Sequence, residues 1–357
     1  MSSPASSVDI EWDTLLDNIA SGRAILCLGA ELFTFDGVSM DERLRQAAGP
    51  QARAYDDGLF YFGGGSDIVA YSRIKRAWQQ PVPGLEALLA QVARIPFQVL
   101  ISLTPDRFLK QAFESQDLPH QHAVYIRRRP APAIEPPGPA LPLLYQFLGE
   151  LEQRESLVLT HDDLYDFFES VIEHRSIPDL LKTRIREAYT FIFLGLPFDK
   201  WYMQLLLRVL GQHTHRNALK YAANHAIDSQ TQAFCFEQFN ILSVPAQTGP
   251  FVAELYQHCE AAGILRGAGT SASPKARLLA LLKQDRLREA LDELLDRYES
   301  LQPPDPEGLN LLIGLSGRLS RLEQKQGLGS ISHEHAQVER AQIRETLLAF
   351  IQEMPDA

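Results

Sequence analysis

The sequence predicts an α/β domain with a mostly parallel sheet and helices on both faces, followed by a small all-α helical bundle. Over the first three quarters of the chain, short apolar runs such as Ala24–Leu28 alternate with amphipathic segments. Buried parallel strands and the helices that cover them produce this alternation. Further on, only helical periodicity remains. We therefore expect an α/β domain over residues 1–265, a linker over 266–273 and a helical domain over 274–357.

Strands of the α/β domain are expected where short apolar runs stand between Gly, Pro or charged residues. These runs are Ala24–Leu28, Phe97–Ser102, Ala123–Ile126, Leu143–Leu148, Leu157–Leu159, Thr190–Leu194, Leu219–Ala223 and Phe239–Val244. Helices are expected where apolar residues recur every three or four positions. These segments are Asp9–Ala20, Ile68–Trp78, Gly84–Arg94, Arg107–Glu114, the stretch that follows Thr160, Ile177–Ala188, Lys200–Leu210 and Phe251–Ala262.

The segment Leu141–Phe168 lies at the centre of this domain and is predicted to form a strand, a turn, a second strand and a helix. Thr160 and Asp163 resemble a capping box in which Asp replaces the usual Glu, so a helix is expected to begin there. The Pro-rich segment Pro130–Pro142 cannot be a helix or a central strand and is expected to be an exposed connection. Gly58–Ser66 contains three consecutive glycines and is expected to be a loop, either over a pocket or on the plain surface.

The C-terminal domain is expected to be a bundle of four amphipathic helices. It follows the Gly- and Ser-rich segment Gly263–Ser273, which has the composition of a domain boundary. The helices are expected at Pro274–Lys283, Arg286–Tyr298 and Leu309–Lys325, and a fourth is capped by Ser332 and carries Ile343, Leu347, Phe350 and Ile351 on one face.

Composition argues against several classes of protein. The net charge of −11 disfavours a nucleic-acid binder held by phosphate contacts. The basic run Arg127–Arg129 is interpreted as a solvated strand end. Three cysteines, Cys27, Cys235 and Cys259, are too few for a disulfide framework and form no metal-type pair. The N-terminus lacks the pattern of a secretory signal, and every apolar run falls short of the ~18 residues needed to span a bilayer. We expect a cytoplasmic protein that binds neither nucleic acid nor membrane.

Four segments, taken together, resemble the bacterial sirtuin-like, NAD-binding family. Ala24–Glu31 (AILCLGAE) falls where the family has an apolar strand and a GAG turn, and Ile101–Leu109 (ISLTPDRFL) resembles its TTNYDxLL segment. Phe147–Glu150 (FLGE) falls where the family has HG before a strand, and Phe191–Asp199 (FIFLGLPFD) resembles its FxGxSxxD segment. The resemblance implies a Rossmann-like, sirtuin-type sheet and NAD or ADP-ribose as the ligand. The implied binding positions are Gly29, Ala30, Glu31, Thr104, Asp106, Leu148, Gly195 and Asp199.

The same alignment places unusual residues at the positions that carry the family's chemistry. In sirtuins an Asn and a His act at the nicotinamide ribose, and these positions are Thr104 and Leu148 here. Leucine has no group that accepts a proton, and loss of a positioned general base typically costs about 10²–10⁴-fold in rate. Glu31 replaces the third residue of the GAG turn and is expected to repel a pyrophosphate. The resemblance thus implies that the standard NAD-cleaving machinery is missing.

Other residues of the chain are candidates to replace the missing base. His161 stands at the predicted start of a helix, where it either reaches the ligand crevice or is simply a first-turn residue beside two aspartates. Glu31 and Asp199 are further candidate bases. Three H-x-H pairs are present, but no third ligand is evident beside any of them, so no metal is expected. The pairs are His120/His122, His213/His215 and His333/His335.

The C-terminal bundle resembles the effector-associated, death-like adaptor domains of bacterial conflict systems, on the pattern of its last two helices. That resemblance implies a partner protein with a matching domain, bound through residues 274–357, and self-association into a homo-oligomer.

Three functions are compatible with the sequence. The favoured one is a component of a bacterial antiphage immune system in which a catalytically degenerate sirtuin fold acts as a nucleotide sensor or scaffold. The alternative is an NAD-hydrolysing effector that depletes NAD through a non-standard residue. An unrelated α/β enzyme is the third, and no G-x-S-x-G or P-loop motif supports it.

Overall fold

The computed structural model describes residues 10–50, 52–63, 67–172, 176–215, 217–224, 227–267, 278, 282, 287–299, 306–327 and 333–353. The chain divides into two compact units, residues 1–266 and 267–357, and each is described by itself. Within the described ranges, no helix has the length and apolar content required to cross a membrane.

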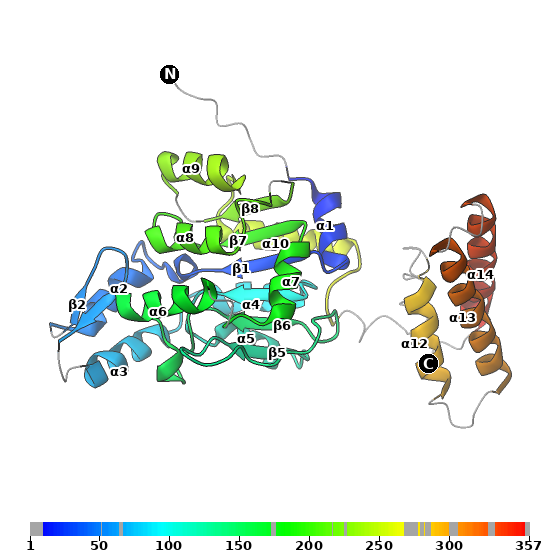
Figure 1. Ribbon diagram of the computed structural model, residues 1–357, viewed down its shortest axis with the longest axis horizontal. Coiled ribbons are helices and arrows are strands. Elements are labelled where there is room, and N and C mark those ends of the chain that lie inside the picture. The colour runs from blue at the N-terminus through cyan, green and yellow to red at the C-terminus, as the bar shows by residue number, and fades with distance from the viewer. Residues whose placement is uncertain are drawn as a thin grey trace, which may run out of the picture. The chain divides into compact units, whose positions relative to one another are not determined.

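The first unit is built on one seven-stranded sheet in which every strand pair is parallel (Figure 1). Its strand order is β5-β6-β4-β1-β7-β8-β9. The bounds are β1 Ala24–Leu28, β4 Val99–Ser102, β5 Gln121–Val124, β6 Leu143–Gln146, β7 Thr190–Leu194, β8 Leu219–Ala223 and β9 Leu242–Ser243. The predicted Rossmann-like α/β architecture is confirmed.

Helices cover both faces because alternate residues of each buried strand point to opposite sides. On one side, Ile25 and Cys27 of β1 join a core with α6, α7, α8 and α9. On the other side lie α1, α4, α5 and α10, which contact one another and, through α1, the strands β1 and β7. The bounds are α1 Trp12–Ala20, α4 Leu85–Arg94, α5 Phe108–Glu114, α6 His161–Ile172, α7 Asp179–Glu187, α8 Trp201–Val209, α9 Ser229–Phe239 and α10 Thr248–Ala261.

An insert between β1 and α4 lies beyond the carboxyl end of β1 (Figure 1). It begins with a 3₁₀ turn, η1, followed by α2, an antiparallel hairpin of β2 and β3, and α3. The hairpin corrects the expected loop at Gly58–Ser66, because β3 occupies part of it; residues 64–66 lie outside the described part of the chain. The bounds are η1 Ala30–Phe33, α2 Met40–Ala48, β2 Ala52–Ala54, β3 Phe60–Phe62 and α3 Asp67–Trp78.

The predicted strand at Leu157–Leu159 is wrong. The segment follows a 3₁₀ turn, η2 (Arg154–Ser156). It meets the hairpin through the hydrogen bond from Phe60 N–H to Leu159 O and the neighbouring isolated bridge from Phe60 to Thr160, which do not make a ladder strand. A run of three apolar residues was too short to distinguish a ladder strand from an extended buried connection. The helix after it begins where the capping box predicts: Thr160 Oγ1 accepts from the N–H of Asp163 at 3.1 Å, and Asp163 Oδ2 accepts from the N–H of Thr160 at 3.0 Å.

The second unit is helical, as expected. Its described helices are α12 Leu287–Glu299, α13 Pro306–Gly327 and α14 His333–Glu353. Their apolar faces form one core, which Leu278 and Leu282 of the predicted first helix also join. The rest of that helix, most of the predicted linker, and the capping residue Ser332 lie outside the described residues.

Candidate functional site

The candidate site lies at the carboxyl ends of the central strands. β1 is the position at which the strand order changes direction, with β4 and β6 on one side and β7 and β8 on the other. In open α/β sheets, ligands bind outside the carboxyl ends at such a point. Hydrogen bonds hold the insert between β1 and α4 against this edge of the sheet. Lys200, after β7, donates to the backbone oxygen of Asp56 at 2.7 Å, and Tyr71 of α3 donates to the backbone oxygen of Leu151 at 2.5 Å.

The turn after β1 is packed tightly on the turn after β7. The N–H of Gly29 donates to Leu194 O and the N–H of Glu31 donates to Gly195 O, both at 2.9 Å. A Cβ built on Gly29 would lie 2.3 Å from the oxygen of Gly195. Glycine is therefore required at position 29 by the backbone of the neighbouring turn, and two N–H groups of this turn are already used.

Glu31 is partly buried among other charged side chains of this edge. Burial, with Asp199 and Asp41 adding to it, raises the pKa of Glu31 to about 8, and Lys200 opposes the shift. Oε2 of Glu31 is buried without a hydrogen-bond partner. Lys200 forms ion pairs with Asp41 at 3.0 Å and with Asp199 at 3.7 Å. The turn thus carries a carboxyl group where a third glycine would present only backbone.

Thr104 and Asp106 are buried in the turn after β4. Thr104 Oγ1 lies 2.9 Å from Ser102 Oγ, so its hydroxyl group is bound to the end of its own strand. Oδ1 of Asp106 accepts from the N–H of Phe108 at 2.9 Å, at the start of α5. Oδ2 of Asp106 is buried without a partner, and burial raises the pKa of this carboxyl group. The hydroxyl of Thr104 is thus committed to a contact within the turn.

Leu148 follows β6 and packs, partly buried, on the core beneath α6. Its backbone oxygen accepts from the N–H of Val158 at 3.2 Å. The next residue, Gly149, has φ of +83°, and a Cβ there would lie 2.0 Å from the oxygen of Ser156. The backbone at this position is therefore fixed, and the side chain it presents is aliphatic, with no atom that accepts a proton.

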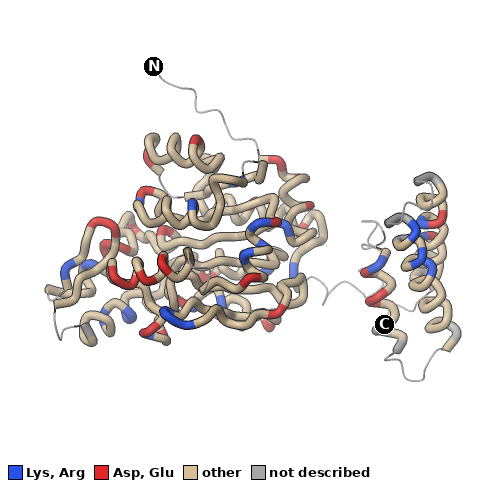
Figure 2. The backbone as a smooth tube through the Cα atoms, viewed as in Figure 1, with Lys and Arg blue, Asp and Glu red and all other residues tan. Residues whose placement is uncertain are grey.

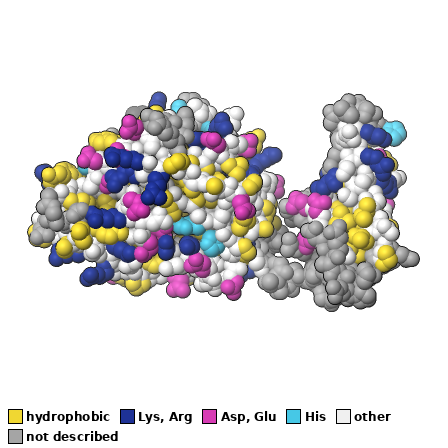
Figure 3. All heavy atoms as spheres, turned by 60° about the horizontal axis from the view of Figure 1, so that its bottom comes forward, with side chains coloured by type: hydrophobic (Ala, Val, Ile, Leu, Met, Phe, Trp, Pro, Cys, Tyr) yellow, Lys and Arg dark blue, Asp and Glu magenta, His cyan; other side chains and the backbone are white. Residues whose placement is uncertain are grey.

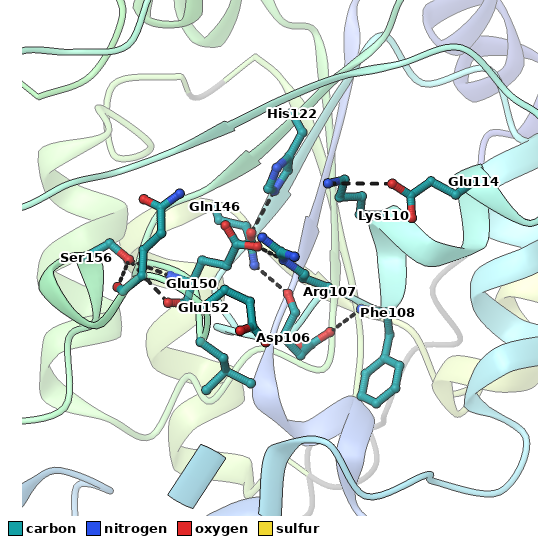
Figure 4. A network of polar contacts seen from close by, with 12 residues as sticks. Asp106, Arg107, Phe108, Lys110, Glu114, His122, Gln146, Glu150, Glu152 and Ser156 are labelled. Atoms are coloured by element: carbon teal, nitrogen blue, oxygen red, sulfur yellow. Dashed lines mark hydrogen bonds and ion pairs between the residues drawn. The ribbon is translucent and has the colours of Figure 1, made fainter. Parts of the chain in front are cut away.

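A polar network that the sequence did not predict joins the ends of β4, β5 and β6 (Figure 4). Gln146 of β6 donates through Nε2 to the backbone oxygens of Thr104 at 3.2 Å and Asp106 at 2.5 Å. Its Oε1 lies 2.7 Å from Nε2 of His122. Burial lowers the pKa of His122, against the effect of this hydrogen bond. His122, one half of an H-x-H pair in the sequence, thus contacts the glutamine that binds the backbone of the turn after β4.

Arg107 and Glu150 extend the same network (Figure 4). The two side chains form an ion pair, and the side chain of Glu150 is only 1% exposed. The N–H of Glu150 also donates to Ser156 Oγ at 2.9 Å. This pair connects the turn after β4 to the turn after β6, so both turns are held by the protein's own groups.

His161 lies at the first position of α6 and is joined to the insert. Its Nε2 is 2.9 Å from Oδ2 of Asp57, which also accepts from Trp201 Nε1 at 2.9 Å. The ring of Tyr55 meets the imidazole edge-on, with ring centroids 5.0 Å apart. Burial raises the pKa of Asp57, but hydrogen bonds from Trp201, the N–H of Leu59 and His161 lower it overall. The imidazole is therefore held by a carboxylate, as a positioned base would be.

A cavity of about 500 Å³ opens beside the start of α6. Its wall includes Phe62, Leu157, Leu159 and Thr160, together with Arg127, which is paired with Asp163. His161 is not among its lining residues. The cavity is thus bounded by the hairpin and the connection that precedes α6.

The structure brings some predicted site residues together and separates others. Gly29, Ala30, Glu31 and Gly195 belong to the two packed turns, and Thr104 with Asp106 forms the next turn along the edge. Leu148 lies beyond β4, at the end of β6, and the side chain of Asp199 is 54% exposed. Sequence reasoning missed Asp57, Trp201, Gln146 and Glu150, whose partners are far away in the chain. Within the described ranges, no group of His, Cys, Asp and Glu could hold a metal ion.

The fold and this edge define a Rossmann-like α/β domain of the class that binds ligands at its strand ends, joined to a helical bundle. Residues 99–241 match the family model of the SIR2-like domain, and residues 273–355 match the model of Effector-associated domain 11. The chain therefore contains a SIR2-like domain followed by an effector-associated domain, and the resemblance drawn from the sequence is confirmed. None of the curated proteins matches the chain. The SIR2-like match begins at β4, so the Gly29 turn precedes it.

This combination of domains indicates a component of a conflict or defence system. A SIR2-like domain also implies NAD as its ligand. The Gly29 turn fits a pyrophosphate poorly, because two of its N–H groups are bonded to the β7 side and the space next to Gly29 is filled by backbone. Glu31 places a further carboxyl group there.

Proposed function

We propose that the SIR2-like domain is a catalytically degenerate nucleotide sensor or scaffold in an antiphage system, recruited through its C-terminal helical domain. The observation that carries this proposal is the pair Thr104 and Leu148 at the positions of the sirtuin Asn and His. The hydroxyl of Thr104 is bound to Ser102, and Leu148 packs on the core. Neither side chain is placed to move a ribose proton.

The charge of the crevice supports the same proposal. Glu31 lies close enough to Asp199 and Asp41 for both to raise its pKa. Because its pKa is raised to about 8, Glu31 is largely protonated at neutral pH, so the negative charge that a pyrophosphate would meet comes from Asp41 and Asp199. A pyrophosphate would also find two N–H donors of the turn already bonded. Phosphate-binding turns depend on free N–H groups and a positive helix end. Affinity for NAD is therefore expected to be weak.

The helical unit supports recruitment of a partner. Leu311 and Ile313 of α13, and Val338 and Leu348 of α14, are exposed although the inner faces of both helices are well buried. A contiguous exposed apolar patch marks a contact surface, and these four side chains are proposed to contribute to one. The proposed partner is a protein with a matching effector-associated domain, and the same surface would serve self-association.

Calorimetric titration of the purified full-length chain with NAD and with ADP-ribose tests the proposal. Binding without turnover would identify a sensor, and absence of both would identify a scaffold. Consumption of NAD at a rate above background would contradict a degenerate site. Mixing with a protein that carries the matching domain, followed by size-exclusion chromatography with light scattering, tests recruitment and oligomeric state together.

A second function, hydrolysis of NAD by a non-standard base, is favoured by one observation. His161 has a carboxylate partner, Asp57, which also accepts a hydrogen bond from Trp201. That arrangement resembles an oriented general base. If this function is correct, His161→Ala removes NAD consumption, whereas His335→Ala, an exposed change in the helical unit, leaves it intact.

A further inference from the structure

A second cavity, of about 830 Å³, lies at the amino ends of the strands, on the edge opposite the candidate site. Three connections line it: Ser21–Arg23 between α1 and β1, the end of α7 through Tyr189, and Thr214–Ala218 before β8, in which residue 216 is not described. Because all seven strands are parallel, their amino ends share this edge. The cavity is therefore separate from the Gly29 turn.

The lining of this cavity is basic in a chain that is acidic as a whole. It contains Arg23, Arg184 and Arg186, and Glu187 is the one acidic residue among its described lining residues. The chain carries a net charge of −11. Figure 2 shows Lys and Arg positions along α7, and on the face drawn in Figure 3 basic and acidic side chains are interspersed. Three guanidinium groups around one cavity are thus a local concentration of positive charge.

The described contacts use few of the donors that these arginines carry. Arg184 donates from Nη2 to the backbone oxygen of Pro137 at 2.9 Å, and Arg186 donates from Nη2 to Thr183 Oγ1 at 3.2 Å. Arg23 lies over the ring of Tyr189, 5.2 Å from its centroid. A guanidinium group has five N–H donors, so most of them are left for a ligand or for solvent.

Helix electrostatics explain only part of this arrangement. Arg184 and Arg186 stand in the last turn of α7, where positive side chains complement the helix dipole. Arg23 comes from a different connection, the one that follows α1. Tyr189, which is 54% exposed, adds an aromatic ring beside the three charges. Guanidinium groups bind phosphate oxygens, and an accessible aromatic ring beside them can stack on a ring of the same ligand.

We propose that this cavity binds a phosphate-bearing small molecule, with its phosphates held by Arg23, Arg184 and Arg186 and a ring, where present, stacked on Tyr189. The volume is within the range of small-molecule sites. The proposal does not depend on whether the opposite edge binds or cleaves NAD. It assigns the ligand to the amino edge of the sheet.

Calorimetry of the full-length chain with pyrophosphate and with ATP as probes tests this site. Arg23→Ala and Arg186→Ala are changes at exposed positions and should each weaken binding of both probes about tenfold, because each removes charge-assisted hydrogen bonds. Arg208→Ala, an exposed arginine of α8, is the matched control and should leave both affinities unchanged. Tyr189→Leu should weaken ATP binding more than pyrophosphate binding, because it removes the stacking ring as well as the ring over which Arg23 lies.

Absence of pyrophosphate and ATP binding at millimolar concentration would overturn the proposal. Binding that survives the Arg23→Ala/Arg186→Ala double change would also overturn it and would place the ligand elsewhere. If an oligonucleotide binds through these arginines while both small probes fail, the surface is one for nucleic acid and the proposal is wrong. Circular dichroism of each variant shows whether the fold is retained.

Discussion

A Cβ on Gly29 would lie 2.3 Å from the backbone oxygen of Gly195, so the turns after β1 and β7 touch through their main chains. Gly29→Ala is therefore expected to force these turns apart and to lower the free energy of unfolding by about 1–3 kcal/mol. Urea denaturation measures the change. The matched control is Gly249→Ala, where nothing lies within 4 Å of the added methyl group. Equal stability of the two variants would contradict the packing described.

Glu31 gives stability a predicted dependence on pH. Its pKa rises from an ordinary 4.5 to about 8 on folding, so the folded state holds a proton that the unfolded state releases, and stability falls as pH rises between these values. Glu31→Gln removes the free-energy cost of ionising this partly buried carboxyl group. The variant should therefore be more stable by about 1–2 kcal/mol at pH 8, a figure that allows for the partial exposure of the group to solvent. Below about pH 4.5 no gain in stability is expected, because the carboxyl group is then protonated in both the folded and the unfolded state. Denaturation at both pH values measures it, with the exposed Glu237→Gln as control. A gain that is independent of pH would refute this explanation.

Asp57 links the insert to α6 and α8, and its replacement should be costly. Asp57→Asn keeps the shape but loses an acceptor for His161 and Trp201, so we expect a loss of about 1–3 kcal/mol at pH 7. Because the folded-state pKa of Asp57 is lowered, its contribution is present above the ordinary value of 3.8 and is lost as pH falls through the folded value. Chemical denaturation from pH 3 to 7 follows both effects. Asp199→Asn, at a side chain 54% exposed, should change stability little.

Arg266 is the last residue of the first unit and is expected to stabilise it. The side chain is 9% exposed and donates to the backbone oxygens of Ala93 at 2.6 Å, Ile95 at 3.0 Å and Phe97 at 2.6 Å. Burial lowers its pKa to about 10, still well above neutrality. Arg266→Met removes the donor to these three oxygens, of which that of Ile95 also accepts from the N–H of Phe97 at 2.8 Å. The change should cost about 3 kcal/mol, measured by urea denaturation. Arg208→Met, on the exposed side of α8, should cost much less, and equal losses would show that the buried contacts contribute nothing.

The sequence predicted most of the sheet because its central strands are short, largely apolar runs between turn residues or charged residues. Ala24–Leu28, Thr190–Leu194 and Leu219–Ala223 have the predicted bounds. The helix α9 was missed because most of its apolar residues stand in one short run, Ala233–Phe236, which does not distinguish a helix from a strand. The short hairpin of β2 and β3 was missed because it is stabilised by contacts with α2 and with the segment before α6.

The candidate site was predicted less completely, because its contacts join residues far apart in the chain. Asp57 and His161 are separated by 104 positions, and Gln146 reaches Thr104 across 42. No local pattern in the sequence reveals such pairs. The turn residues Gly29 and Gly195 were found because each follows an apolar strand directly, which is a local signal.

The most direct test of the central claim is NAD consumption by the purified full-length chain, at micromolar protein and millimolar NAD, followed by chromatography of the nucleotide products. Because the resemblance puts Thr104 and Leu148 at the positions of the sirtuin Asn and His, we expect no consumption above the protein-free background, in the wild type and in His161→Ala alike. Consumption by the wild type that disappears in His161→Ala would contradict a degenerate site and would assign the chemistry to the His161–Asp57 pair.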